Sequence, residues 1–207
     1  MVDKGTAITD PKYNNILSYE RKTSWEVTSK VVEKPEISVW MILIPIVFIP
    51  YMQRYAKYKE TSRAFSEGYL YTKKIALDTA YKISTKEMAE EDADLEIEKI
   101  VKTKPNADAR VLNIFEKQLK EIKLLCQHYL ALLKSHGDNY GQLVVNHYKS
   151  YDKFVEFLNQ LGEAEREVSR AATHTFKTDT EEVPEIIENM ENCLNQYRLE
   201  EAKKLFY

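Results

Sequence analysis

The chain has 207 residues, of which 43% are hydrophobic and 30% charged, and its formal net charge at pH 7 is −3. This length suits one domain of roughly 150 residues with a smaller appendage. The slightly acidic balance argues against a general nucleic-acid-binding protein, which usually carries a clear basic excess. Glycine (5 residues) and proline (6 residues) are scarce, so the composition favours helices over strands joined by tight turns.

Residues 1–36 form a polar N-terminal segment that we expect to be only partly ordered. Pro11 follows Asp10, a pair that favours a turn, and scattered apolar residues follow from Ile16 to Val32. These residues indicate either a modest helix that ends before Pro35 or a polar tail lying on a membrane surface.

The stretch 37–53 is uncharged and strongly apolar, in contrast to the sequence on both sides. As a helix it would extend about 25 Å, near the lower limit for crossing a hydrocarbon core of about 30 Å. Prolines interrupt the stretch, and aromatic residues lie toward its ends, as expected of rings at the level of the lipid headgroups. We predict a membrane anchor that includes Trp40, Pro45, Pro50, Tyr51 and Tyr55.

Three interpretations of residues 37–53 stay open. The stretch is a single-pass helix, a re-entrant segment that returns to the face it entered, or a core helix buried in protein. Basic residues are slightly more numerous after the stretch, which predicts a membrane protein with its C-terminal part on the cytoplasmic side. Nearly equal basic flanks are also typical of a hairpin with both ends in the cytoplasm.

Residues 54–207 are predicted to form a cytoplasmic helical bundle. A helical pattern runs from Met52 to about Ile83, and the sequence 84–87 (Ser-Thr-Lys-Glu) matches a capping box that predicts a new helix. That helix is rich in acidic residues. We interpret them as a solvated face, with docking to a basic surface and divalent-cation binding as the alternatives.

The strongest periodic pattern lies in a predicted helix from Pro105 to about His136. Its apolar residues recur at steps of three and four, as in a coiled-coil seam. Gly137 and Asp138 then predict a tight reversal at 136–139. The seam that we predict to contact a partner or a second copy contains Leu112, Phe115, Leu119, Ile122, Tyr129 and Leu133.

Two more helices are predicted after this reversal. The first bends near Gly162, and the last runs from about Thr180 to the lysines Lys203 and Lys204. Short connections favour packing between helices that are neighbours in the sequence. We therefore expect an all-α fold: an elongated antiparallel helical bundle with coiled-coil-like seams, preceded by one short, proline-interrupted hydrophobic membrane segment.

The sequence contains none of the catalytic or cofactor motifs for which we searched. No histidine follows a glutamate at the three-residue spacing of di-iron sites, and H-E-x-x-H, C-x-x-C and glycine-rich phosphate loops are missing. An irregular metal site at His128 and His147 with scattered carboxylates is the remaining alternative. We interpret Cys126 and Cys193 as small core residues. We predict no catalytic residue, no metal and no cofactor.

These features predict a non-enzymatic, membrane-anchored helical scaffold or adaptor that tethers partner proteins at a membrane. Its expected partners are membrane lipid and other proteins or a second copy of the chain, with no nucleic acid. Alternatives are an accessory subunit of a larger membrane enzyme complex and a membrane-shaping hairpin protein. A further alternative is a soluble helical enzyme whose apolar stretch lines a pocket.

Overall fold

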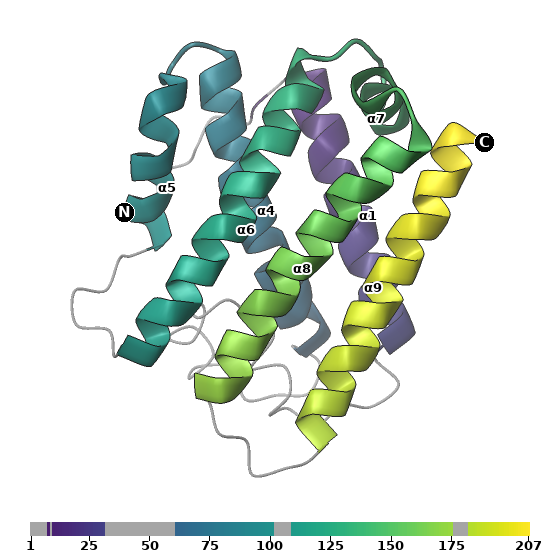
Figure 1. The fold of residues 1–207 in the computed structure, drawn as a ribbon. Coiled ribbons are helices and arrows are strands. Elements are labelled where there is room, and N and C mark those ends of the chain that lie inside the picture. Colours follow the sequence, from purple (N-terminus) through teal and green to yellow (C-terminus); the bar gives the residue numbers. More distant parts are fainter. Residues whose placement is uncertain (1–7, 9, 32–60, 102–108, 176–181) are drawn as a thin grey trace.

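The computed structural model describes residues 8, 10–31, 61–101, 109–175 and 182–207, and the regular structure in these ranges is helical throughout (Figure 1). The predicted all-α fold class is therefore confirmed. The predicted membrane stretch 37–53 lies outside the described residues. The helices are α1 (Pro11–Val31), α4 (Thr61–Ser84), the 3-10 turn η3 (Glu90–Asp92), α5 (Ala93–Val101), α6 (Ala109–Lys134), α7 (Tyr140–Tyr148), α8 (Tyr151–Thr175) and α9 (Glu182–Phe206).

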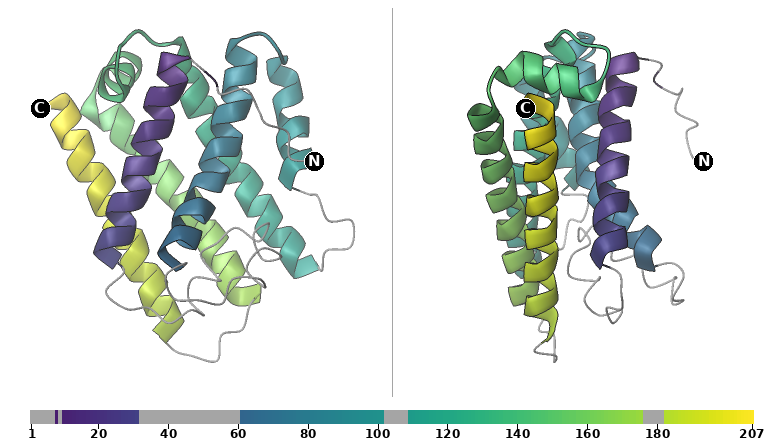
Figure 2. Two further views of the ribbon diagram at one scale, coloured as in Figure 1. Left: turned by 180° about the vertical axis from the view of Figure 1, so that it is seen from behind. Right: turned by 90° about the vertical axis from the view of Figure 1, so that its right-hand side faces the viewer.

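The long helices form a closed ring around one core. In the order α1, α4, α6, α8 and α9, each packs on the next, and α9 packs on α1 (Figures 1 and 2). The short helix α5 lies against α4 and α6, and α7 covers one end of the ring, where it contacts α1, α6, α8 and α9. Leucine, isoleucine and aromatic side chains from these helices fill the interior.

One neighbouring pair departs from the antiparallel order that we expected. Helices α4 and α6 run in the same direction: Thr72 hydrogen-bonds to Glu121, and toward their C-terminal ends Ser84 and Leu133 line one pocket. The reason is α5, which returns the chain along the bundle before α6 begins (Figure 1). The other neighbours in the ring are antiparallel.

Helix α1 is longer and more deeply packed than its polar sequence indicated. Asp10 caps it, since the Asp10 carboxylate accepts hydrogen bonds from the backbone N–H groups of Lys12 (2.8 Å) and Tyr13 (3.2 Å). Pro11 occupies the first turn, where its missing N–H costs nothing. Ile16 and Val27 are buried in the bundle. Within the segment 1–36, α1 is thus a full member of the core.

The predicted capping box at residues 84–87 ends a helix instead of starting one. Lys86 adopts a left-handed conformation (φ 64°), and the backbone N–H of Glu87 donates to the carbonyl of Lys82 at 2.9 Å. This is a Schellman ending of α4, a structure that glycine usually provides. The next α-helix begins only at Ala93, after the turn η3.

A turn is present at the predicted position 136–139, but it leads into α7, which lies across the end of the bundle, and the chain reverses only with α8 (Figures 1 and 2). The bend predicted near Gly162 is not present. Asn139 caps α7, accepting a hydrogen bond from the backbone N–H of Gln142 at 3.0 Å. The break between helices falls at Lys149, which has φ 63° and ends α7. Helix α8 then continues through Gly162 without interruption. A Cβ atom at Gly162 would lie 3.0 Å from the Asn195 side chain, so glycine here allows α9 to approach closely.

Candidate functional site

The most unusual feature of the interior is a group of charged side chains where the five long helices meet. We call it the charge network. Its charged members are Glu20 on α1, Lys73 on α4, Glu121 on α6, Glu165 on α8 and Arg198 on α9. Because each helix of the ring contributes one charged residue, the network joins all of them.

Lys73 lies at the centre of the network. Its ammonium group donates to Glu121 Oε1 and to Glu165 Oε1, both at 2.8 Å, and lies 4.4 Å from the centre of the Tyr69 ring. Only 4% of the Lys73 side chain is exposed. Burial alone lowers the pKa of this amine, but Glu121 and Glu165 outweigh burial and raise it. Lys73 is therefore charged in the folded protein.

Arg198 and Glu165 form a two-pronged ion pair. The two terminal guanidinium nitrogens of Arg198 donate to Glu165 Oε2 at 2.6 Å and to Glu165 Oε1 at 2.9 Å. Burial raises the pKa of Glu165, but Arg198 and Lys73 outweigh burial and bring it down to about 2. Pairs with this fork geometry are among the strongest hydrogen-bonded contacts in proteins. This pair holds α8 to α9.

Glu20 differs from the other two carboxylates because phenols, and not cations, hydrogen-bond to it. Tyr129 donates to Glu20 Oε1 at 2.8 Å, and Tyr69 lies 3.3 Å from Glu20 Oε2. Burial raises the pKa of Glu20, while Lys73 and Arg198 act at longer range to lower it. The side chain is buried, although carboxylates are rarely found inside proteins without a paired cation.

A second cluster surrounds His128 between α6, α7 and α8, and we call it the aromatic cluster. His128 stacks on Phe157, with ring centres 4.1 Å apart, and its Nδ1 lies 2.7 Å from the Tyr148 hydroxyl. Phe154 completes the cluster. Burial lowers the pKa of His128 to about 3, so its ring is neutral, and its Nδ1 shares a hydrogen bond with the Tyr148 hydroxyl.

The alternative of an irregular metal site at His128 and His147 does not match this geometry. His147 is exposed, and His128 is enclosed by aromatic rings. Within the described ranges, no three His, Cys, Asp or Glu side chains are placed so that they could hold a metal ion.

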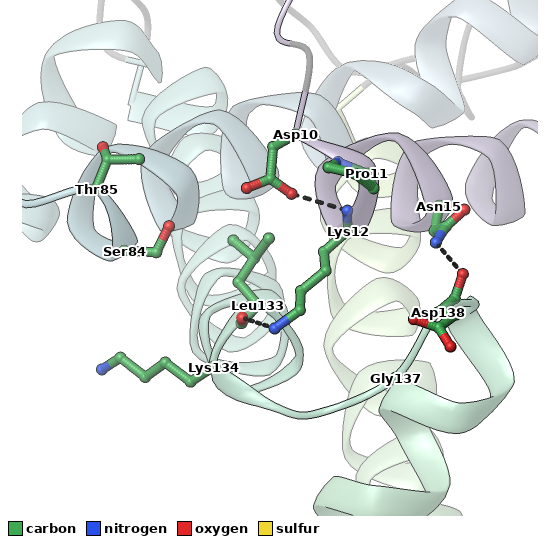
Figure 3. Close-up of a pocket in the computed structure, with 10 residues that line it drawn as sticks. All are labelled: Asp10, Pro11, Lys12, Asn15, Ser84, Thr85, Leu133, Lys134, Gly137 and Asp138. Carbon is green, nitrogen blue, oxygen red and sulfur yellow. Dashed lines mark hydrogen bonds between the residues drawn. The ribbon is translucent and has the colours of Figure 1, made fainter.

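An open pocket of about 720 Å³ lies at the end of the bundle where α1 begins and α4 and α6 end (Figure 3). The Lys12 ammonium reaches across it and donates to the carbonyls of Leu133 (3.1 Å) and Ser135 (2.6 Å). Asn15 donates to the carbonyl of Asp138 at 2.8 Å. These contacts satisfy carbonyls at the C-terminus of α6 and tie α1 to the loop that follows it.

The predicted anchor residues lie outside the described part of the chain, so the prediction of an anchor stays a prediction. Within the described ranges, no helix combines the length with the hydropathy that crossing a bilayer requires. The anchor residues concerned are Trp40, Pro45, Pro50, Tyr51 and Tyr55.

The predicted seam of α6 packs on helices of its own chain. Phe115, Ile122, Tyr129 and Leu133 are buried and Leu119 is partly buried, whereas Leu112 near the start of the helix is exposed. The apolar periodicity therefore identified the core-facing side of α6. Binding of a partner through this seam stays a prediction.

Sequence reasoning missed the charge network, although a signal for it exists. Glu20 follows the buried Ile16 by four residues, and Glu165 follows the buried Leu161 by four, so each carboxylate continues the apolar stripe of its helix. Such a position predicts burial, and a buried charge requires a partner.

No protein-family model, no curated protein and no solved structure matches this chain.

Proposed function

We propose that this protein is a non-enzymatic helical scaffold attached to one face of a membrane by residues 37–53. The observation that carries the proposal is the packing of α1 on α4, the helices that precede and follow this apolar stretch in the sequence. We propose that the stretch enters and leaves the bilayer on the same side and that the bundle presents its surface to other proteins there.

Helices α1 and α4 are antiparallel neighbours joined by specific contacts. The hydroxyl of Tyr13 donates to Asp78, and Tyr69 contacts Glu20 farther along the pair. The last residue of α1, Val31, and the first of α4, Thr61, lie at the same end of the bundle, which is the lower end in Figure 1. The chain between them therefore starts and ends on one side of the folded domain.

This arrangement argues against a single crossing by residues 37–53. A single-pass helix would leave α1 and α4 on opposite faces of a hydrocarbon core about 30 Å thick. The contacts of Glu20 with Tyr69 and Tyr129 cannot form across that distance. A segment that dips into one leaflet and returns keeps these contacts, and prolines within the stretch suit such a break in the helix.

A scaffold role is supported by the ion pairs in the interior of the bundle. Lys73, Arg198, Glu121 and Glu165 bind one another and so fix which helices are neighbours. Tethering such a bundle raises the local concentration of whatever its surface binds, without new contacts.

Membrane extraction of the full chain tests the proposal. We expect the protein to remain in the pellet after high-salt and alkaline-carbonate washes. A variant with residues 37–53 replaced by a glycine–serine linker of equal length should become soluble and keep its helical circular dichroism. Trp25→Ala is the matched control, because Trp25 is an exposed aromatic residue outside the stretch. The Trp25→Ala protein should remain in the pellet. Release of the full chain by carbonate would refute the attachment and identify the stretch as core or pocket lining.

Membrane shaping is the second candidate, favoured by the same placement of α1 and α4. A wedge in one leaflet requires both flanks on one face, which this packing supports. Electron microscopy of liposomes mixed with the full chain distinguishes the two candidates: a wedge forms tubules or small vesicles, whereas a passive anchor leaves the liposomes unchanged.

A further inference from the structure

We propose that Glu20 is a buried proton-binding site, whose carboxyl group carries a proton while α1 is packed in the bundle. The proposal concerns the folded domain and does not depend on membrane attachment. The charge network contains three carboxyl groups, Glu20, Glu121 and Glu165, and two cations, Lys73 and Arg198. With Glu20 protonated, the network is neutral.

The positions of the cations decide which carboxyl holds the proton. Glu165 accepts hydrogen bonds from both Arg198 and Lys73, and Glu121 accepts from Lys73 and from the Thr72 hydroxyl. Among the described residues, Glu20 has no cation within ion-pair distance. An ionised carboxylate in this position would be buried without direct compensation, which proteins usually avoid by keeping the group neutral.

The groups that face Glu20 from the helices packed against α1 also favour a proton on Glu20. Phenols from α4 and α6, Tyr69 and Tyr129, touch its two oxygens. At longer range it faces the cations of Lys73 and Arg198, the carboxylate of Glu165 on α8, and Tyr140 on α7. Burial is the largest influence and raises the pKa of Glu20.

Protonation also suits the hydrogen bonding at Glu20. The shorter contact, from the Tyr129 hydroxyl to Oε1 at 2.8 Å, requires an acceptor that both forms of the carboxyl provide. The longer contact, in which the Tyr69 hydroxyl donates to Oε2 at 3.3 Å, is weak, so Oε2 is the oxygen that loses least by carrying the proton.

The proton links the packing of α1 to pH. The pKa of Glu20 is higher in the folded chain than the ordinary value of 4.5. The folded state therefore binds more protons than the unfolded state between these two values, and stability decreases as pH rises through this window. For one such group the ratio of folded to unfolded protein falls by up to about tenfold per pH unit.

Urea unfolding of the full chain as a function of pH tests the proposal with the variant Glu20→Gln. Glutamine has the shape of the protonated carboxyl and no charge. In the wild type, ionisation of Glu20 contributes to the fall in stability above pH 4.5, and Glu20→Gln lacks this contribution. We therefore expect the stability of Glu20→Gln to fall less as pH rises and to be at least that of the wild type at pH 8. An equal pH slope in both proteins, or a loss of more than tenfold in the folded-to-unfolded ratio at pH 8, would overturn the proposal.

Glu121→Gln is the matched control. Glu121 pairs directly with Lys73, so its amide variant should lose stability at every pH between 5 and 8. Infrared difference spectra of the wild type at pH 6 provide a readout that needs no stable variant. They should contain a protonated-carboxyl band that is missing in Glu20→Gln. A wild type without any such band at pH 6 would also overturn the proposal.

Discussion

The charge network and the aromatic cluster each bury a titratable group in its neutral form, but the two groups make stability depend on pH in opposite directions. Burial raises the pKa of the Glu20 carboxyl and lowers that of the His128 imidazole, because in both cases it disfavours the charged form. Stability consequently decreases with rising pH at Glu20 and with falling pH at His128.

The two regions also differ in what one lost side chain leaves behind. In the charge network Lys73, Arg198, Glu121 and Glu165 are ion-paired, so removing one of these four leaves another buried charge without a partner. In the aromatic cluster a lost ring leaves a cavity lined by apolar groups. The network thus fixes the neighbours of each helix, whereas the cluster contributes mainly by burying apolar surface.

The largest effect is expected from Lys73→Met. Removing this cation leaves Glu121 and Glu165 without their shared partner, and breaking a buried ion pair in this way costs about 4 kcal/mol. Urea unfolding monitored by circular dichroism measures the loss. Lys74→Met is the control, because Lys74 is exposed on the same helix, and its change should alter stability by no more than about 0.5 kcal/mol. Equal losses of stability in Lys73→Met and Lys74→Met would show that the network contributes no more to stability than an exposed lysine does.

Phe157→Ala should be the next most damaging change. The ring is buried against His128, and truncation of a buried phenylalanine costs about 3 kcal/mol through lost burial and the cavity left behind. This loss should hardly vary between pH 6 and pH 8, because the Phe157 ring carries no charge. Unfolding curves at both pH values check the difference, and a pH-dependent loss would mean that charge contributes here too.

Acidification should weaken the bundle through His128. Its pKa is about 3 in the folded protein and near 6.5 when unfolded, so the unfolded state binds the extra proton. The contribution of a neutral His128 is present above pH 6.5 and is lost as pH falls, by up to about 1.4 kcal/mol per pH unit. NMR titration of the imidazole checks the prediction. A His128 resonance that titrates near pH 6.5 would show that the ring is not buried in its neutral form.

Tyr148→Phe is expected to have the smallest effect. It removes the hydroxyl that is hydrogen-bonded to His128 Nδ1 but keeps the ring, so the cost is that of one buried hydrogen bond, about 1 kcal/mol. Comparison of the unfolding midpoints of the variant and the wild type measures it. A loss as large as that of Phe157→Ala would mean that polar contacts dominate the aromatic cluster.

Periodicity predicted the helices well and their ends poorly. The three-and-four pattern of α6 located its buried face, because Ile122 and Tyr129 must face the core wherever the helix begins. The end of α4 at Ser84 agrees with the helical pattern that runs to about Ile83, but residues 84–87 end that helix instead of starting the next, because Lys86 adopts the left-handed conformation that sequence rules assign to glycine. Sequence rules indicate a bend at Gly162, whereas in the structure this glycine provides space for the Asn195 side chain.

Sequence reasoning missed the charge network because its residues are of types that are normally exposed. A lysine or glutamate in a helix is normally exposed, so Lys73 and Glu165 were not assigned to the core. Which cation meets which carboxylate depends on the order of helices around the ring, and the parallel pair α4 and α6 was not foreseen. The apolar stripes of the helices indicate which charged residues are buried, but which of them form ion pairs follows only from the folded structure.

Side-specific labelling tests most directly whether α1 and α4 lie on one face of the membrane. In a chain with Cys126→Ala and Cys193→Ser, single cysteines are introduced at the exposed positions Ser18 on α1 and Lys74 on α4. Sealed vesicles that carry either variant are then treated with a membrane-impermeant maleimide. Attachment to one face predicts that both cysteines react to the same extent before detergent is added. Reaction of one cysteine in sealed vesicles and of the other only after detergent would mean that residues 37–53 cross the bilayer and that α1 and α4 are not packed together.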